Sequence, residues 1–139
     1  IEKFIPKVIK SVLNGDKVYI HSYPDKKTSG TRYYIHSRNI AEAVLFLLKK
    51  GNIGESYNLT GEQEISNLEM AQMIAKVIGK PLNYELVDFH SSRPGHDLRY
   101  GLDGNKMYSM GWKLPVDFQK SLENMIKWTL ENKEWLEEI

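Results

Sequence analysis

The sequence from residue 66 to residue 81 reads Ser66-Asn67-Leu68-Glu69-Met70-Ala71-Gln72-Met73-Ile74-Ala75-Lys76-Val77-Ile78-Gly79-Lys80-Pro81. Ser66 and Glu69 have the spacing of a capping box, in which each side chain bonds the other residue's backbone N–H. Gly79 and Pro81 supply the stop signal. The apolar positions recur at helical spacing, at Leu68, Ala71, Ile74, Ala75 and Ile78. This stretch therefore predicts an amphipathic helix with one face in a core.

Further helices are predicted on both sides of this stretch. Apolar residues repeat at helical spacing from Phe4 to Leu13, before an Asn14-Gly15 stop. Ser37 is a predicted cap for a helix that ends at Lys49-Lys50-Gly51, and a short helix spans about residues 106–110. Asp117 is a predicted cap for the final helix.

The first helix has no capping residue and the chain does not open on Met. We therefore expect residues 1–139 to form one domain that is a piece of a longer protein.

Short β-like runs alternate with these helices. They cover residues 17–21, 33–35, 56–59 and 84–87, and the run at 56–59 reads as a buried strand. No repeat or long linker interrupts the alternation. The alternation leaves α/β and α+β as the possible classes, and we expect α/β, a small helix-rich domain with short strands.

Composition excludes several classes of function. The net charge of +1 gives no basic excess for binding nucleic acid, and 41% hydrophobic residues fit a folded globular domain. The longest apolar run, residues 40–48, is too short to span a bilayer, so we expect no membrane partner. The lack of cysteine agrees with a cytoplasmic location.

One loop carries the most chemistry, Ser91-Ser92-Arg93-Pro94-Gly95-His96-Asp97-Leu98-Arg99-Tyr100. Its two guanidiniums offer planar forks of donors that suit a phosphate, and Pro94-Gly95 favours a shaped turn over a helix. The alternative is a solvated loop in which Arg93 and Arg99 pair with Asp97 or Asp103. Residues from elsewhere also suit such a ligand: Lys3 and Arg32 by their charge, and Asn58 by its amide. From the residues alone, two interpretations stay open. The chain is a domain that binds a phosphorylated ligand, or it is a domain whose arginine-rich loop is only a charged, solvated surface.

Other sites are disfavoured. The glycine pairs at 51–54 and 101–104 do not join a strand to a helix with a third glycine, so we interpret them as turns. The four histidines show no helical pairing with carboxylates, which disfavours a metal site. Tyr23 and Lys27 have a spacing that serves proton transfer on a helix, but Pro24 spoils that helix.

Three further observations concern motifs that are continuous in the chain: Glu2-Lys3-Phe4-Ile5-Pro6, Ser56-Tyr57-Asn58-Leu59-Thr60-Gly61 and Arg93-Pro94-Gly95-His96-Asp97-Leu98-Arg99-Tyr100 with Asp103. These motifs resemble the C-terminal, substrate-binding part of NAD-dependent sugar-nucleotide epimerases and dehydratases, a group of extended short-chain dehydrogenases/reductases. The ending, Met110-Gly111-Trp112-Lys113-Leu114-Pro115 and 118–128, is similar as well. The resemblance covers nearly the whole chain and is nearest to the 4,6-dehydratases of this family.

The resemblance implies roles for individual residues. Lys3 and Phe4 match positions that touch the nucleotide sugar, and Asn58 matches an asparagine near the nucleotide. Tyr19 and His21 match a strand that flanks the base. Arg93 and His96 match the loop around the diphosphate and ribose.

At one position the chain departs from the family. The family has an arginine for the diphosphate at the start of an Arg-Asp-Trp-x-Tyr-Val run, and this chain has Gly30 there. Arg32 lies two residues later, on the same strand face, and is expected to substitute by a longer reach.

The resemblance also implies what this chain lacks. In the family a preceding Rossmann domain binds NAD and carries the catalytic residues, so residues 1–139 are expected to bind no cofactor and to be inactive alone. The implied partners are a dTDP- or UDP-linked nucleotide sugar, the chain's own Rossmann domain and, for the full-length protein, a second copy in a homodimer.

The favoured activity is 4,6-dehydration of the sugar. It would proceed by transient oxidation at C4, loss of water across C5 and C6 and return of the hydride. A 4-epimerase lobe, a non-catalytic nucleotide-binding module and a purely structural domain remain as alternatives.

Overall fold

A computed structural model of the protein describes residues 3–90, 94–95 and 97–137. Three helices form its body: α1 (Phe4–Asn14), α3 (Asn67–Ile78) and α5 (Phe118–Glu131), followed by the 3-10 turn η1 (Lys133–Leu136). α3 packs against both α1 and α5. The hydrophobic core between these helices includes Val8, Ile9, Met70, Ile74 and Ile126, each 0% exposed.

The capping box predicted for the central helix is confirmed. Ser66 Oγ accepts the Glu69 N–H at 3.1 Å, and Glu69 Oε2 accepts the Ser66 N–H at 2.9 Å. Gly79 ends the helix with a left-handed φ of 77°. The first helix likewise starts without a side-chain cap at Lys3, and Asp117 caps α5 by accepting the Lys120 N–H at 2.8 Å.

In the described part of the chain, five short strands form two small sheets. β1 (Val18–His21) pairs in parallel with β4 (Tyr84–Val87) beside the body. β2 (Thr31–Arg32) lies between β3 (Ile65–Ser66), which is antiparallel to it, and β5 (Arg99–Tyr100), which is parallel. The α/β, helix-rich class is therefore confirmed.

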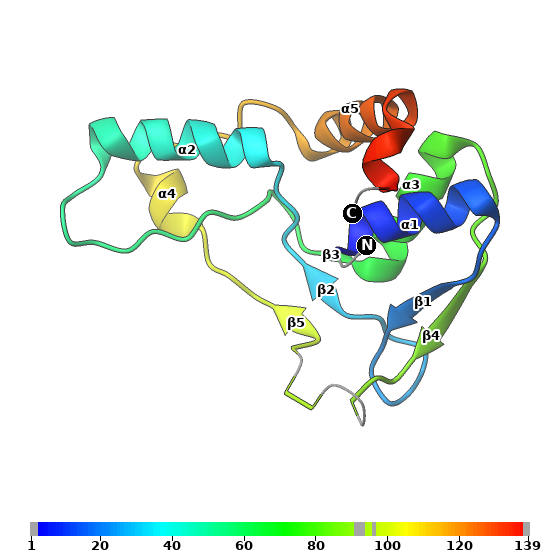
Figure 1. The fold of residues 1–139 in the computed structure, drawn as a ribbon. Coiled ribbons are helices and arrows are strands. Elements are labelled where there is room, and N and C mark those ends of the chain that lie inside the picture. Colours follow the sequence, from blue (N-terminus) through cyan, green and yellow to red (C-terminus); the bar gives the residue numbers. More distant parts are fainter. Residues whose placement is uncertain (1–2, 91–93, 96, 138–139) are drawn as a thin grey trace.

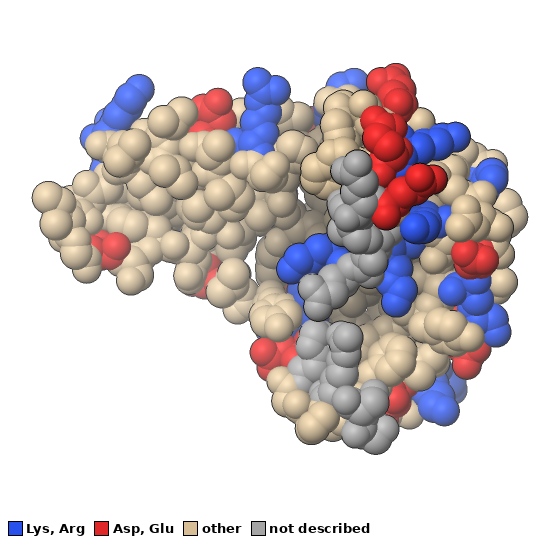
Figure 2. Space-filling model, in the orientation of Figure 1, with Lys and Arg blue, Asp and Glu red and all other residues tan. Residues whose placement is uncertain are grey.

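Two helices extend to one side of the body as an arm (Figure 1). The arm consists of α2 (Ser37–Lys50) and α4 (Asn105–Ser109), and it has its own small core of Ala43, Met107 and Trp112. Figure 2 shows acidic and basic side chains interspersed over the body on the face in view, whereas the arm is mostly uncharged there. No helix in the described ranges is long and apolar enough to cross a membrane.

Three local predictions were wrong. The strand predicted at 33–35 lies two residues earlier, at Thr31–Arg32, because only that segment lies between two partner strands. Residues 56–59 form no strand and are exposed or half-buried, since Tyr57 and Leu59 pack against the arm core instead of entering a sheet. His36, not Ser37, caps α2: its Nδ1 accepts the Arg38 N–H at 3.0 Å.

Candidate functional site

Parallel pairing of β2 with β5 forms the centre of the candidate site. Thr31 lies opposite Arg99, and Arg32 lies opposite Tyr100. These strands join the first third of the chain to the end of the arginine-rich loop. Just before β5, Gly95 has a left-handed φ of 79°, which confirms the shaped turn predicted for Pro94-Gly95.

The Arg32 guanidinium faces the backbone of that loop. Its Nη1 donates to the carbonyl oxygens of Thr31 and Leu98, at 2.6 and 2.7 Å, and its Nη2 donates to that of Asp97 at 2.8 Å. The guanidinium carbon also lies 4.1 Å from the centre of the Tyr100 ring, within cation–π range. A direct contact between Arg32 and a diphosphate stays a prediction, but much of the fork is already engaged by the protein.

The packing around Gly30 leaves no room for the arginine that the resemblance implies at this position. A Cβ added there would lie 2.5 Å from the Leu98 carbonyl oxygen, which is too close for any side chain. The backbone on both sides is fixed, because the Gly30 N–H donates to His21 O at 3.1 Å and Gly30 O accepts the Asn67 N–H at 2.8 Å. A side chain at position 30 therefore requires the segment around Leu98 to move.

Glu64 holds the other side of β5. Arg99 donates to it through two nitrogens, Nε to Oε1 at 2.6 Å and Nη2 to Oε2 at 2.8 Å, and the Thr31 hydroxyl donates to Oε1 at 2.5 Å. The bonds from Arg99, followed by the bond from Thr31, lower the pKa of Glu64 to about 2. The alternative pairing of Arg99 with Asp97 or Asp103 is wrong, because Arg99 pairs with Glu64.

Tyr19 and His21 lie on β1, where they alternate with the buried Val18 and Ile20. Tyr19 is exposed, with the Lys17 ammonium 6.0 Å from its ring centre. The His21 ring packs edge-on against Phe89, at 5.4 Å between centroids. Both side chains therefore project from the strand that adjoins Gly30.

The other predicted contacts are spread over the molecule. Lys3 is exposed at the start of α1, and Phe4 packs partly buried against the main core. Asn58 lies beside the arm, where its Nδ2 donates to Asp103 O at 3.1 Å. Arg93 and His96 lie outside the described residues.

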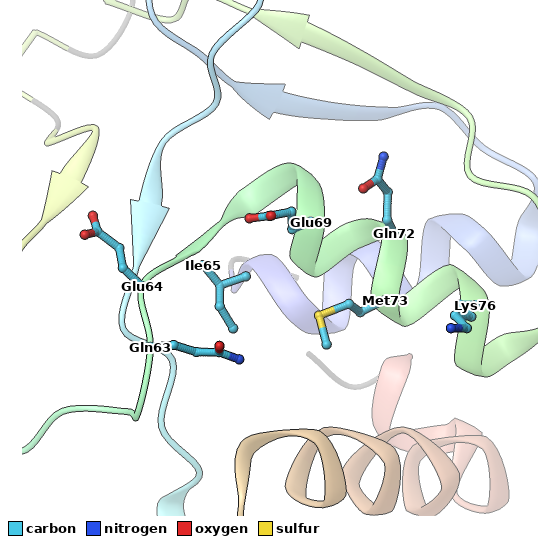
Figure 3. Close-up of a pocket in the computed structure, with 7 residues that line it drawn as sticks. All are labelled: Gln63, Glu64, Ile65, Glu69, Gln72, Met73 and Lys76. Atoms are coloured by element: carbon cyan, nitrogen blue, oxygen red, sulfur yellow. The ribbon is translucent and has the colours of Figure 1, made fainter.

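A cavity of about 360 Å³ adjoins Glu64 (Figure 3). The Glu64 carboxylate points toward β2, and Glu69 is engaged with Ser66. Both carboxylates are thus already bonded within the protein. A second, apolar cavity of about 250 Å³ lies between the starts of α1, α2 and α5, with Ile5, Tyr34 and Phe118 among its walls.

Comparison with known proteins shows what this arrangement is similar to. No family model matches the chain. A dTDP-glucose 4,6-dehydratase of Xanthomonas campestris pv. campestris is 31% identical over 147 residues, which cover 99% of this chain and 40% of that protein. The chain resembles the nucleotide-sugar 4,6-dehydratases. The trifunctional UDP-glucose 4,6-dehydratase/UDP-4-keto-6-deoxy-D-glucose 3,5-epimerase/UDP-4-keto-L-rhamnose-reductase of Arabidopsis thaliana is 33% identical, over 96% of this chain and 19% of that protein.

Solved dehydratase structures agree with this resemblance. The dTDP-glucose 4,6-dehydratase of Bacillus anthracis, in complex with NAD, superposes with a TM-score of 0.80 at 30% identity, over 96% of this chain and 41% of that one. The enzyme of Streptomyces venezuelae, with NAD and TYD bound, gives 0.78 at 28% identity, over 96% and 40%. This chain therefore spans about 40% of the length of the dTDP-glucose 4,6-dehydratases that it matches, consistent with a C-terminal part.

The sequence did not reveal Glu64 or the role of Tyr100 as the surface beneath Arg32. Glu64 lies 35 residues from Arg99 and belongs to no motif, so no local spacing connects them. Tyr100 was visible in the loop motif, but its partner became apparent only from the pairing of β2 with β5.

Proposed function

We propose that this chain is the C-terminal, nucleotide-sugar-binding lobe of an NAD-dependent nucleotide-sugar 4,6-dehydratase. The observation that carries the proposal is the similarity to dTDP-glucose 4,6-dehydratase along 99% of the chain. The same match covers only 40% of the relative, which leaves ample length there for a separate dinucleotide-binding domain.

Dehydration is favoured over epimerisation by the identities. The two dehydratase structures compared above are 30% and 28% identical to this chain, whereas a UDP-glucose 4-epimerase of Thermus thermophilus is 23% identical. At that level the epimerase shares the fold alone. The 4-epimerase lobe is therefore the second candidate.

The proposal divides the work between two domains. NAD belongs to the preceding Rossmann domain, because this sequence has no glycine-rich strand–turn–helix that would cradle a pyrophosphate. When bound, NAD supplies a transient hydride acceptor for the sugar. The present lobe holds and orients the nucleotide, and orientation alone lowers the barrier of such a reaction substantially.

Within this lobe the proposed substrate contacts come from three regions. Lys3 and Phe4 approach the sugar nucleotide from the start of α1, and Tyr19 and His21 flank the base from β1. The remaining proposed contacts lie in or near the later loops, and they are Asn58, Arg93 and His96. Arginine suits the diphosphate because its planar fork matches two anionic oxygens at once.

The substrate class is a dTDP- or UDP-linked glucose, since the two relatives named above carry these two nucleotides in their names. The complete protein is proposed to form a homodimer, which light scattering of the purified protein measures directly.

The test uses the complete gene product, purified and supplied with NAD. Incubation with dTDP-glucose, and separately with UDP-glucose, is expected to yield a 4-keto-6-deoxy sugar nucleotide from one of them. Mass spectrometry detects this product by its loss of one water. A 4-epimer with unchanged mass would establish the second candidate instead, and binding without turnover would establish a non-catalytic module.

The 139-residue chain alone is the matched control. It is expected to give no turnover and no tight NAD binding. Turnover by this chain alone would contradict the proposed division between the two domains.

A further inference from the structure

We infer that Arg32 is a positioning residue for nucleotide-sugar binding: it fixes the backbone of residues 97–100, and this role replaces the direct diphosphate contact predicted from the sequence. This inference rests on the proposed function. It extends that function, because it assigns a role to Arg32 and to the neighbouring Gly30, both of which lie against the Leu98 carbonyl.

The Arg32 guanidinium is bonded to the protein's own backbone. Its three bonds to the carbonyls of Thr31, Leu98 and Asp97 measure between 2.6 and 2.8 Å, the range of strong charge-assisted bonds. Its central carbon lies over the Tyr100 ring, 4.1 Å from the centroid. Lysine could not reproduce this contact, because an ammonium has neither the fork nor the flat face.

The position of the Leu98 carbonyl depends on three neighbouring residues: Thr31, Arg32 and Gly30. It accepts the Thr31 N–H at 2.8 Å and Arg32 Nη1 at 2.7 Å. It also occupies the space that a side chain at Gly30 would need. Gly30 and Arg32 therefore act on the same group. Gly30, which has no side chain, lets the Leu98 carbonyl approach β2, and the hydrogen bond from Arg32 keeps it there.

Residues 97–100 are also held on the sheet face opposite Arg32. Arg99 and Tyr100 are consecutive strand residues, so their side chains point to opposite faces. The Tyr100 ring contacts the Arg32 guanidinium. Arg99 donates two hydrogen bonds to Glu64, the residue that precedes β3. Residues 97–100 are thus fixed on both sides, at the end of the motif that contains Arg93 and His96, two of the proposed substrate contacts.

The experiment uses the complete gene product and whichever of dTDP-glucose and UDP-glucose the wild type converts. Arg32→Lys and Arg32→Ala are both expected to raise KM about tenfold or more with kcat changed by less than about threefold. Arg38→Lys, on an exposed residue of α2, is the matched control and is expected to leave KM unchanged. If Arg32→Lys keeps the wild-type KM while Arg32→Ala raises it, a positive charge at position 32 is enough for binding, and the inference is overturned.

Two further variants probe the same arrangement. Tyr100→Phe keeps the aromatic face and is expected to match the wild type, whereas Tyr100→Leu is expected to raise KM several-fold. Gly30→Arg is expected to raise KM although it adds a cation, because its side chain displaces Leu98. A lower KM for Gly30→Arg would overturn the inference.

Hydrogen–deuterium exchange of the ligand-free protein supplies a readout that needs no substrate. Arg32→Lys is expected to speed exchange in peptides covering residues 97–101, and unchanged exchange would overturn the inference. A wild type that converts no nucleotide sugar would refute the proposed function, and this exchange measurement would still decide whether Arg32 fixes the segment.

Discussion

Glu64 and Arg99 form a two-pronged ion pair across the small sheet, with nitrogen–oxygen distances of 2.6 and 2.8 Å. The Glu64 side chain is 25% exposed and that of Arg99 57%. Because the same carboxylate accepts the Thr31 hydroxyl, it joins β2 and β5 from one position.

The pair predicts a specific dependence of stability on pH. The pKa of Glu64 falls from 4.5 in an ordinary environment to about 2 in the folded protein. Its contribution is therefore complete above about pH 4.5 and is lost as the pH falls toward 2. Urea unfolding of the wild type and of Glu64→Gln across this range should show a difference that is constant at neutral pH and shrinks in acid. A difference that grows on acidification would contradict the assignment.

Ile74 is expected to be a major contributor to the core, since it is 0% exposed on α3 between α1 and α5. Ile74→Val should lower the free energy of unfolding by about 0.5–1.5 kcal/mol, and Ile74→Ala by about 2–5 kcal/mol. Gln72→Ala, on the exposed face of the same helix, serves as the control and should change it by less than about 0.5 kcal/mol. Equal effects at positions 72 and 74 would show that the packing differs from that described.

Ser66→Ala is expected to cost about 1 kcal/mol of stability, because it leaves the Glu69 N–H without its capping acceptor. Ser66→Asp keeps an acceptor at the same position and should recover most of the loss. Thermal unfolding of the three proteins measures both steps. Failure of Ser66→Asp to recover stability would mean that the hydroxyl has another role.

Substitution of Lys3 tests whether the start of α1 contacts the nucleotide sugar, as proposed. In the complete protein, Lys3→Ala is expected to raise KM for the nucleotide sugar about 10-fold or more, the loss of one charge-assisted hydrogen bond. Lys7→Ala, one turn further along the same helix and equally exposed, should leave KM unchanged. Equal KM values for the two variants would exclude Lys3 from the site.

The limits of sequence-based prediction are visible at residues 30–36. The fold class, the helices and the strands at β1 and β4 follow from periodicity and stop signals, and the structure confirms them. Because aromatic residues favour strands, the sequence nevertheless predicts a strand at Tyr33-Tyr34-Ile35. Tyr34 instead turns inward and donates its hydroxyl to Asn67 Oδ1 at 2.6 Å, a partner that its neighbours in sequence do not reveal.

The sequence by itself determined the helices and most of their ends, because caps, glycine stops and apolar spacing act within one or two turns. It also determined the resemblance to the nucleotide-sugar dehydratases, through motifs that are continuous in the chain. Only the tertiary structure decided what Gly30 and Arg32 do. The partner of both is Leu98, whose carbonyl lies 66 residues from Arg32. Contacts over such distances depend on which strands pair and in which register, and the register is set by the packing of the whole domain.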